Sequence, residues 1–266
     1  MRVTLKPPLR GEGQGEGDNK KGQRMGNHLA VDPDTLKSDD LLAMIDYTLL
    51  KPEADLDAYS AFLAAARQLG VGSVFVPPYY VPLAAGMLSA TDVKIGTPVS
   101  FPFGYAAPEI KAAEALAALE EGASELDVVM NISAARSGAW ESVDEDLLTV
   151  VSAVREWEKL TLKGPVVIKL ILETPFLDED QKREACRRAA ATGMDFVKTA
   201  TGLGPGGATV EDVRLMRETV GDKLGVKAAG GIRTWEDARA MIAAGANRLG
   251  TSTAPELVED FIRATA

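Results

Sequence analysis

Five charged side chains stand in short apolar runs of this sequence, where a strand buried on both faces should carry only Val, Ile and Leu. Two are acids and three are lysines, and each belongs to a different run: Asp46, Asp127, Lys169, Lys198 and Lys227. Burying a charge is costly unless it meets a partner or water. Taken singly, each could be an outward or rim residue in a structural ion pair. Five on separate strands favour a shared polar pocket instead.

The lysines indicate which chemistry such a pocket would perform. Lys198 and Lys227 end two successive apolar runs, so their ammonium groups should lie close together if the strands are neighbours. Two like charges that are close and partly desolvated lower the proton affinity of at least one amine. A neutral lysine amine attacks a carbonyl to form an imine, an electron sink for carbon–carbon cleavage. Asp127 could then accept or relay protons.

The composition argues against several other chemistries. The only histidine, His28, stands in a polar N-terminal stretch, and the only cysteine, Cys186, lies in a pattern typical of an amphipathic helix. A Ser-His-Asp or Cys-His arrangement and a His-rich zinc site are therefore not expected. A single cysteine also favours a reducing, cytoplasmic setting. The net charge of −10 opposes nucleic-acid binding, which needs a clustered basic face.

Short β-leaning runs alternate with Ala-rich helical patterns from residue 40 onward. Strands are expected at residues 43–50, 73–76, 93–99, 125–130, 166–172, 196–199, 226–229 and 248–250. Apolar residues at three- and four-residue spacing predict helices over residues 59–69, 108–121, 143–160, 178–191, 209–220 and 234–244. This alternation predicts an α/β fold, a (β/α)8 TIM barrel. An open doubly wound sheet is the alternative, but no Gly-rich dinucleotide fingerprint follows the first strand.

Helix ends and chain ends complete the outline. Glycines that close helices just before a strand predict left-handed C-caps at Gly70, Gly122, Gly193 and Gly245. Thr209 and Thr234 each precede an acid by three residues, as in a capping box. Residues 1–38 are low in complexity and predict a flexible tail before a single barrel domain over residues 39–266. The sequence has no apolar run of about eighteen residues, so we expect no membrane span.

The loops after the late strands are rich in Gly and hydroxyl residues. Residues 199–207 read Thr-Ala-Thr-Gly-Leu-Gly-Pro-Gly-Gly, and Gly230-Gly231 and Gly250-Thr251-Ser252 follow the last two strands. In barrels these loops often hold a phosphate on backbone N–H groups, and Gly lets the backbone approach closely. Each Gly pair alone could be an ordinary tight turn. Together, beside two lysines, the loops predict a phosphorylated substrate.

Five segments resemble the deoxyribose-phosphate aldolase family and occur in the family's order. They read IDYTLLKP at 45–52, FPFG at 101–104, ELDVVMN at 125–131, DFVKTATG at 195–202 and VKAAGGIRT at 226–234. The resemblance runs from about residue 42 to 255 and leaves out the N-terminal stretch. It implies a class I aldolase that reversibly cleaves 2-deoxy-D-ribose 5-phosphate to acetaldehyde and D-glyceraldehyde 3-phosphate, without metal or cofactor.

The resemblance also implies a role for each matching residue. Lys198 falls at the Schiff-base lysine, Lys227 at the lysine that tunes it, and Asp127 at the acid that relays protons. Asp46 and Lys169 match polar pocket residues. The other expected substrate-binding residues, most of them where the family holds phosphate, are Thr201, Gly202, Gly230, Gly231 and Ser252.

The chain departs from the family at four positions. Tyr47 stands where the family commonly has His, Phe75 and Pro77 stand where it commonly has Cys and Asn, and Ala200 stands where it often has Ser. An Asn-to-Pro change removes two donors and an acceptor near the end of the second strand, so the exact substrate preference is left open. One alternative is a related Schiff-base barrel aldolase acting on another sugar phosphate. Another is a non-catalytic phosphate-binding barrel. The expected partners are a small phosphorylated sugar and further copies of the chain, with a homodimer expected first.

Overall fold

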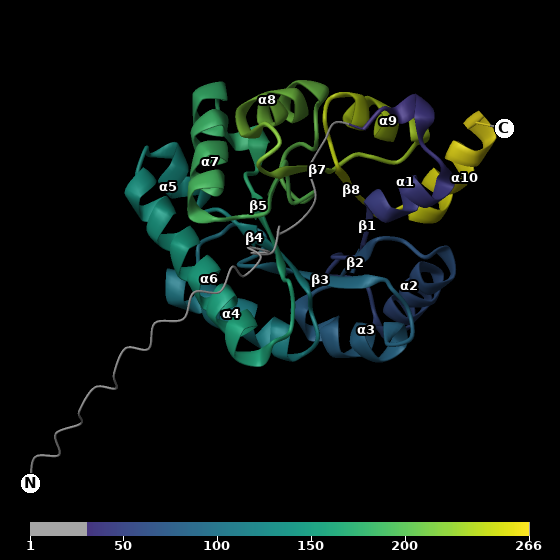
Figure 1. Ribbon diagram of the computed structural model, residues 1–266, viewed down its shortest axis with the longest axis horizontal. Helices are drawn as coiled ribbons and strands as arrows, with labels where there is room; N and C mark the ends of the chain where they lie inside the picture. The colour runs from purple at the N-terminus through teal and green to yellow at the C-terminus, as the bar shows by residue number, and fades with distance from the viewer. Residues whose placement is uncertain (1–30, 266) are drawn as a thin grey trace, which may run out of the picture.

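Eight short strands meet edge to edge in the computed structural model, which describes residues 31–265. Each strand pairs in parallel with the next along the chain, and β8 pairs with β1, so the sheet closes into a barrel (Figure 1). The strands are β1 (Ile45–Thr48), β2 (Ser73–Phe75), β3 (Lys94–Val99), β4 (Glu125–Val129), β5 (Val167–Ile171), β6 (Phe196–Lys198), β7 (Gly225–Ala229) and β8 (Arg248–Thr251). The predicted TIM barrel is confirmed.

The helices surround the barrel on its outside (Figure 1). The α-helices are α1 (Ser38–Met44), α2 (Leu56–Leu69), α3 (Val81–Leu88), α4 (Pro108–Glu120), α5 (Ile132–Arg136), α6 (Trp140–Thr161), α7 (Glu179–Thr192), α8 (Val210–Val220), α9 (Trp235–Ala243) and α10 (Ala254–Thr265). The 3-10 helices are η1 (Pro33–Thr35), η2 (Pro78–Tyr80) and η3 (Thr174–Phe176). All six helices that the sequence predicts are present. The start of the first predicted strand, at residue 43, is wrong because α1 runs directly into β1.

The predicted helix ends are largely confirmed. The four glycines expected as C-caps have φ between 70° and 112°: Gly70, Gly122, Gly193 and Gly245. At the start of α9, Thr234 and Asp237 exchange side chain-to-backbone hydrogen bonds in a capping box. At the start of α8, the Thr209 hydroxyl accepts from the N–H of Asp212, but the capping box is incomplete because the N–H of Thr209 does not donate to the Asp212 side chain. The Asp212 carboxylate instead accepts from Lys182 Nζ at 2.6 Å.

Side chains alternate along each strand between the outer core and the barrel interior, because successive residues of a strand point to opposite faces. Leu126, Val197 and Val226 are fully buried in the apolar core that also contains the inner faces of the helices. The intervening residues, among them Asp127 and Lys198, point into the barrel, where the site forms.

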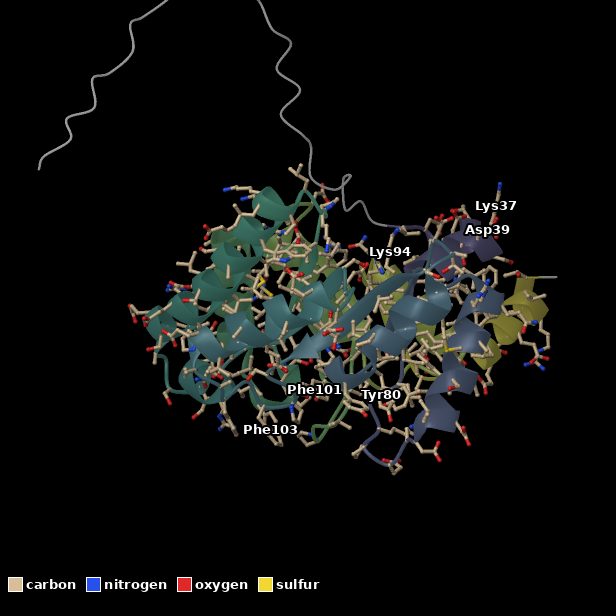
Figure 2. The ribbon with its side chains drawn as sticks, turned by 90° about the horizontal axis from the view of Figure 1, so that it is seen from below. Lys37, Asp39, Tyr80, Lys94, Phe101 and Phe103 are labelled. Carbon is tan, nitrogen blue, oxygen red and sulfur yellow. The ribbon has the colours of Figure 1, made fainter. Side chains whose placement is uncertain are left out.

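The two ends of the barrel differ. Figure 2 shows Lys94, at the start of β3, on one side of the molecule and Phe101 and Phe103, which follow β3, on the opposite side. The loops that follow the strands therefore gather at a single end. In barrels this is the end that carries the site.

Packing onto the barrel begins slightly before residue 39. Val31 and Leu36 contact the core, and the Asp34 carboxylate lies 2.8 Å from Arg239 of α9. Residues 1–30, including His28, lie outside the described residues, so the expectation of a flexible tail there stays a prediction. Cys186 is buried in α7, as the helical pattern predicts. Within residues 31–265, none of the helices combines the length and the apolar character that crossing a bilayer requires.

Candidate active site

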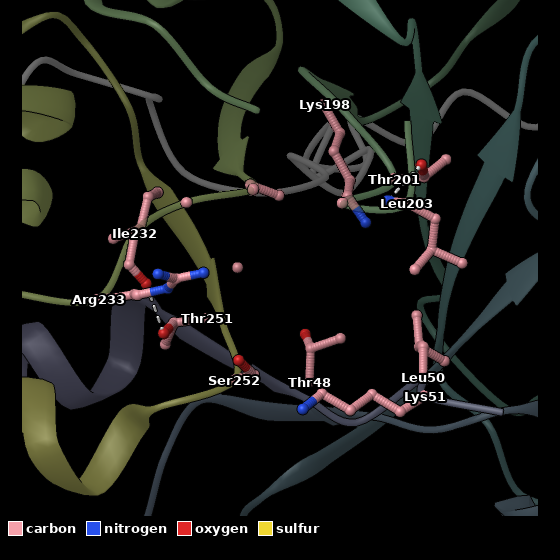
Figure 3. Close-up of a pocket in the computed structure, with 15 residues that line it drawn as sticks. Thr48, Leu50, Lys51, Lys198, Thr201, Leu203, Ile232, Arg233, Thr251 and Ser252 are labelled. Carbon is pink, nitrogen blue, oxygen red and sulfur yellow. Dashed lines mark hydrogen bonds between the residues drawn. The ribbon is translucent and has the colours of Figure 1, made fainter. Parts of the chain in front are cut away.

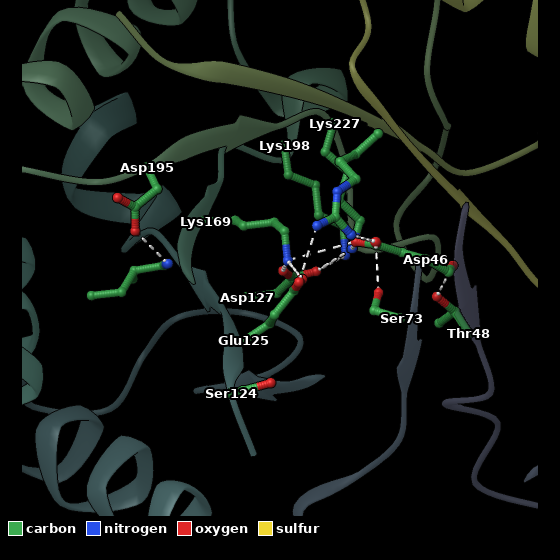
Figure 4. A network of polar contacts seen from close by, with 12 residues as sticks. Asp46, Thr48, Ser73, Ser124, Glu125, Asp127, Lys169, Asp195, Lys198 and Lys227 are labelled. Atoms are coloured by element: carbon green, nitrogen blue, oxygen red, sulfur yellow. Dashed lines mark hydrogen bonds and ion pairs between the residues drawn. The ribbon is translucent and has the colours of Figure 1, made fainter. Parts of the chain in front are cut away.

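The five strand charges meet inside the barrel (Figure 4). Asp127 of β4 is the register partner of Lys169 on β5, and Lys198 of β6 is the register partner of Lys227 on β7. Paired residues of a parallel ladder lie on the same face, so these side chains converge. Lys198 is 3% exposed, and Asp46, Asp127, Lys169 and Lys227 are fully buried. The structure thus brings together all five residues that the sequence singled out.

Asp127 is the centre of this cluster. Its Oδ2 lies 2.8 Å from Lys198 Nζ and 2.8 Å from Lys227 Nζ, and its Oδ1 lies 3.3 Å from Lys169 Nζ. Burial alone would raise the pKa of this carboxyl, but the three ammonium groups outweigh burial and hold it well below its usual value. Asp127 is therefore an ionised acceptor shared by two lysines.

Lys227 lies between two carboxylates. Its Nζ is 2.5 Å from Asp46 Oδ2 and 2.8 Å from Asp127 Oδ2. Burial lowers its pKa to about 8, although both carboxylates oppose that change. The positive charge of Lys198 adds to the lowering, but it contributes less than burial does. The like-charge effect expected from the sequence is therefore present, with desolvation as the larger cause.

Two members of the cluster were not singled out from the sequence. Glu125 Oε2 accepts from Lys169 Nζ at 2.5 Å, and Glu125 Oε1 accepts from Arg248 at 3.0 Å. Arg248 also donates to Asp46 Oδ1 at 2.5 Å. The pKa of Lys169 is raised because these carboxylates outweigh the effect of burial. Glu125 stands two residues before Asp127, and the two-residue period of a strand could have placed both on one face.

The charges of the cluster do not balance. Three carboxylates face three lysines and one arginine: Asp46, Glu125, Asp127, Lys169, Lys198, Lys227 and Arg248. With every group ionised, four positive charges meet three negative charges, so the excess is one positive charge. One lysine can therefore lose its proton without leaving a carboxylate unpaired. That is the condition an amine nucleophile requires.

Of the three lysines in the cluster, Lys198 is the one that a substrate can reach. A cavity of about 250 Å³ opens at the loop end of the barrel, and Lys198 lines it, whereas Lys169 and Lys227 do not (Figure 3). All five loop residues expected to bind substrate also line this cavity: Thr201, Gly202, Gly230, Gly231 and Ser252. An aldehyde carbon in the cavity can reach the amine of Lys198.

The glycine loops form the wall next to this amine. Gly202, Gly230 and Gly231 have φ of 84°, 95° and 86°, a left-handed backbone that Gly adopts without strain. A Cβ on Gly230 would lie 2.8 Å from Gly207 Cα, so the two loops pack backbone against backbone. This wall presents peptide groups rather than side chains to the cavity, which suits a phosphate.

Two further cations, which the sequence did not predict as site residues, also line the cavity. Lys51 follows β1 and Arg233 follows β7, and both side chains are exposed at the rim (Figure 3). Both stand within segments that resemble the family, at residues 45–52 and 226–234, and this position indicates a role at the site. A phosphate beside the glycine loops would meet both charges.

Glu173 holds one of these loops in place. It follows β5, is 1% exposed and has φ of 56°. Its Oε2 accepts from the N–H of Thr201 at 2.7 Å. The Thr201 hydroxyl in turn accepts from the N–H of Leu203 at 3.1 Å. The amide of Thr201 is thus already bonded, whereas its hydroxyl, an acceptor in this turn, can still donate its proton to a substrate.

The four departures from the family pattern have different surroundings. Tyr47 packs on Phe62 with ring centres 4.3 Å apart and does not line the cavity around Lys198. Pro77 lines a neighbouring cavity of about 380 Å³, and Ala200 is fully buried. Phe75 lies inside the barrel beside the lysines. Across residues 31–265, no group of three or more His, Cys, Asp or Glu side chains is arranged to hold a metal ion.

Comparison with known proteins places this site in a family. A model of the DeoC/LacD family aldolases matches residues 29–253. The deoxyribose-phosphate aldolase of Caldanaerobacter subterraneus subsp. tengcongensis is 49% identical over 218 residues, covering 82% of this chain and 92% of that protein. The one of Thermococcus gammatolerans is 49% identical over 222 residues, covering 83% and 96%.

Solved structures agree with these relatives. The deoxyribose phosphate aldolase of Aeropyrum pernix, described as a unique tetrameric structure, matches with a TM-score of 0.77 at 32% identity, covering 86% of this chain and 93% of that chain. A putative deoxyribose-phosphate aldolase from Coccidioides immitis matches with a TM-score of 0.80 at 31% identity, covering 91% and 92%. The chain belongs to the DeoC/LacD family of aldolases.

Proposed function

We propose that this protein is a class I aldolase that reversibly cleaves 2-deoxy-D-ribose 5-phosphate to acetaldehyde and D-glyceraldehyde 3-phosphate. One observation carries the proposal: Lys198 is the one cluster lysine that lines the cavity, and it shares Asp127 with a second lysine. The names of the relatives support the substrate.

Imine formation begins at Lys198. Its neutral Nζ attacks the C1 aldehyde of the sugar, and loss of water from the resulting carbinolamine gives an iminium ion. Asp127, 2.8 Å from Lys198 Nζ, accepts the proton that the amine releases, directly or through water. Lys227, 2.8 Å from the same carboxylate oxygen, keeps that oxygen bound to a cation while the proton moves.

Carbon–carbon cleavage uses the iminium ion as an electron sink. The C3 hydroxyl loses its proton to the Asp127 carboxylate through water, the C2–C3 bond breaks, and its electrons form an enamine on Lys198. D-glyceraldehyde 3-phosphate then leaves. Protonation of C2 and addition of water to the new iminium ion release acetaldehyde and restore the amine.

The phosphate group binds at the glycine loops. Gly202, Gly230 and Gly231 offer peptide groups, Ser252 adds a hydroxyl, and Arg233 supplies a rim cation. Asp46 and Lys169 lie behind Lys198 and maintain the charges of the cluster. They would act on the substrate through Asp127 and Lys227 instead of touching it.

The assay for this function compares substrates directly. Purified protein is incubated with 2-deoxy-D-ribose 5-phosphate, and the glyceraldehyde phosphate released is measured with a coupled dehydrogenase. In the synthetic direction, acetaldehyde and dihydroxyacetone phosphate are offered as donors to the same acceptor. Cleavage of the deoxy sugar with acetaldehyde as donor is expected. Turnover only with dihydroxyacetone phosphate would identify an aldolase for another sugar phosphate, and turnover with neither would contradict the proposal.

The assembly and the location belong to the same proposal. We expect a homo-oligomer, with a dimer first, acting in the cytoplasm on a small phosphorylated sugar. The tetramer described for the Aeropyrum pernix relative supports self-association without fixing the number of copies. Light scattering of the purified protein measures that number.

A further inference from the structure

Phe75 places an aromatic ring among the three lysines of the cluster. It is the last residue of β2 and is 1% exposed. The centre of its ring lies 3.7 Å from Lys227 Nζ, 4.5 Å from Lys169 Nζ and 5.9 Å from Lys198 Nζ. An ammonium group over an aromatic face within about 6 Å is attracted to the ring, most strongly where water is excluded. The three lysines therefore lie at unequal distances from one ring.

The ring is fixed in this place by the neighbouring strand. Phe75 is the register partner of Gly96 on β3, and a Cβ on Gly96 would lie 2.3 Å from the tip of the ring. Only glycine at that position leaves room for the ring without a shift of its neighbours. The contact with the lysines is therefore set by two residues on adjacent strands.

The ring acts within a field of charges from most of the barrel. Asp46 faces the cluster from β1, Glu125 and Asp127 from β4, Lys169 from β5, Lys198 from β6, Lys227 from β7 and Arg248 from β8. The Asp127 oxygen does not distinguish Lys198 from Lys227, because it lies 2.8 Å from both ammonium groups. Asp46 and the Phe75 ring do distinguish them, since both lie closer to Lys227.

We propose that Phe75 is a positioning residue whose aromatic face offsets part of the cost of burying the Lys227 ammonium and so favours Lys227 over Lys198 as the holder of the cluster's shared proton. The attraction between an ammonium group and a ring falls steeply with distance. At 3.7 Å the Lys227 ammonium is in contact with the face, whereas at 5.9 Å the Lys198 ammonium is at the edge of the effective range. The inference rests on the proposed imine at Lys198.

Loss of the aromatic face has a definite consequence for the pH profile. Without it, the form with the proton on Lys198 gains population over the form with the proton on Lys227. Freeing the attacking amine then requires more alkaline pH, where a further proton leaves the cluster. Imine formation should therefore be slower near neutral pH and recover under alkaline conditions. A loss of packing alone would slow the reaction by the same factor at every pH.

The experiment measures the rate of imine formation at Lys198 from neutral to alkaline pH, by trapping acetaldehyde with borohydride and quantifying the Lys198 peptide. Phe75→Leu removes the face, while phenylalanine analogues with increasing ring fluorination retain the shape and weaken it. Phe261→Leu, in α10 against Trp235, is the matched truncation of a buried ring away from the cluster. We expect Phe75→Leu to be about 10-fold slower near neutral pH, with its acid limb moved to higher pH.

The outcomes separate the inference from the proposed function. A graded shift of the acid limb with fluorination supports the inference even if Phe75→Leu does not fold. An unshifted acid limb across the fluorinated series would overturn it, as would a loss equal at all pH values in Phe75→Leu. A shift as large in Phe261→Leu would also overturn it. A wild-type protein without any adduct at Lys198 would instead overturn the proposed function itself.

Discussion

Replacing Lys227 by leucine tests how the cluster controls its proton. The substitution removes the ammonium group that lies 2.8 Å from Asp127 and 2.5 Å from Asp46, and it leaves a shorter, apolar side chain. Three carboxylates then face three cations: Lys169, Lys198 and Arg248. The excess positive charge is gone, so a neutral Lys198 would leave the cluster with a net negative charge. The remaining cluster should therefore resist the loss of a proton that imine formation requires.

The size of the effect follows from the geometry. The ammonium groups of Lys198 and Lys227 lie 2.8 Å from the same oxygen, so they are separated by at most twice that distance. Two unit charges at that separation repel by about 3 kcal/mol at an effective dielectric constant of about 20. Without this repulsion, removing a proton from the cluster costs more by the same amount, which corresponds to a factor of about 100. Imine formation near neutral pH is therefore expected to fall about 100-fold.

The assay for this prediction is the rate of borohydride-trapped acetaldehyde adduct as a function of pH. Lys111→Leu is the matched control, since Lys111 is a fully buried lysine paired with Asp146 at 2.5 Å outside the barrel interior. Both variants lose a buried ammonium group, but only Lys227→Leu should lose activity that alkaline pH restores. A Lys227→Leu protein with a near-normal rate at neutral pH would refute this reasoning.

Further expectations concern the acid, the rim and stability. Asp127→Asn should lower kcat for deoxyribose phosphate cleavage about 10²- to 10⁴-fold, because the shared proton acceptor is lost; a decrease below tenfold would count against its role. Arg233→Met and Lys51→Met should raise KM for 2-deoxyribose 5-phosphate but not for unphosphorylated 2-deoxyribose; equal changes for both sugars would argue against phosphate contacts. Although burial opposes it, the cations hold the pKa values of Asp46 and Asp127 below 3.8, so the folded state binds fewer protons than the unfolded state. The resulting stability is complete above about pH 5 and is lost as the pH falls through and below 3.8. The free energy of unfolding, measured in urea, should therefore decrease over this acid range. In Asp127→Asn it should depend less steeply on pH.

The barrel could be predicted because its signals are local. Each strand is a short apolar run, each following helix has its own periodicity, and glycines such as Gly70 and Gly193 mark the turns between them. The boundary at Met44 and Ile45 was missed because the end of α1 and the start of β1 are both apolar. The pattern of apolar residues cannot locate the boundary between a helix and a strand when no turn residue separates them.

The five central charges could be predicted because they break the apolar pattern of buried strands. Glu125 and Arg248 were missed because each stands at the first position of its strand, where a charge looks like an exposed end. Only the closed sheet brings Glu125 to Lys169 and Arg248 to Asp46. The relation of Phe75 to the lysines also needed the fold, since a buried aromatic residue in a strand is ordinarily read as core.

Reductive trapping of the unmodified protein tests whether Lys198 forms the imine. Acetaldehyde and borohydride are added together, the protein is digested, and the modified peptide is located by mass spectrometry. We expect a single ethyl group on Lys198, and we expect Lys198→Ala to lose both this adduct and the cleavage activity. An unmodified Lys198, an adduct on another lysine, or full activity in Lys198→Ala would contradict it.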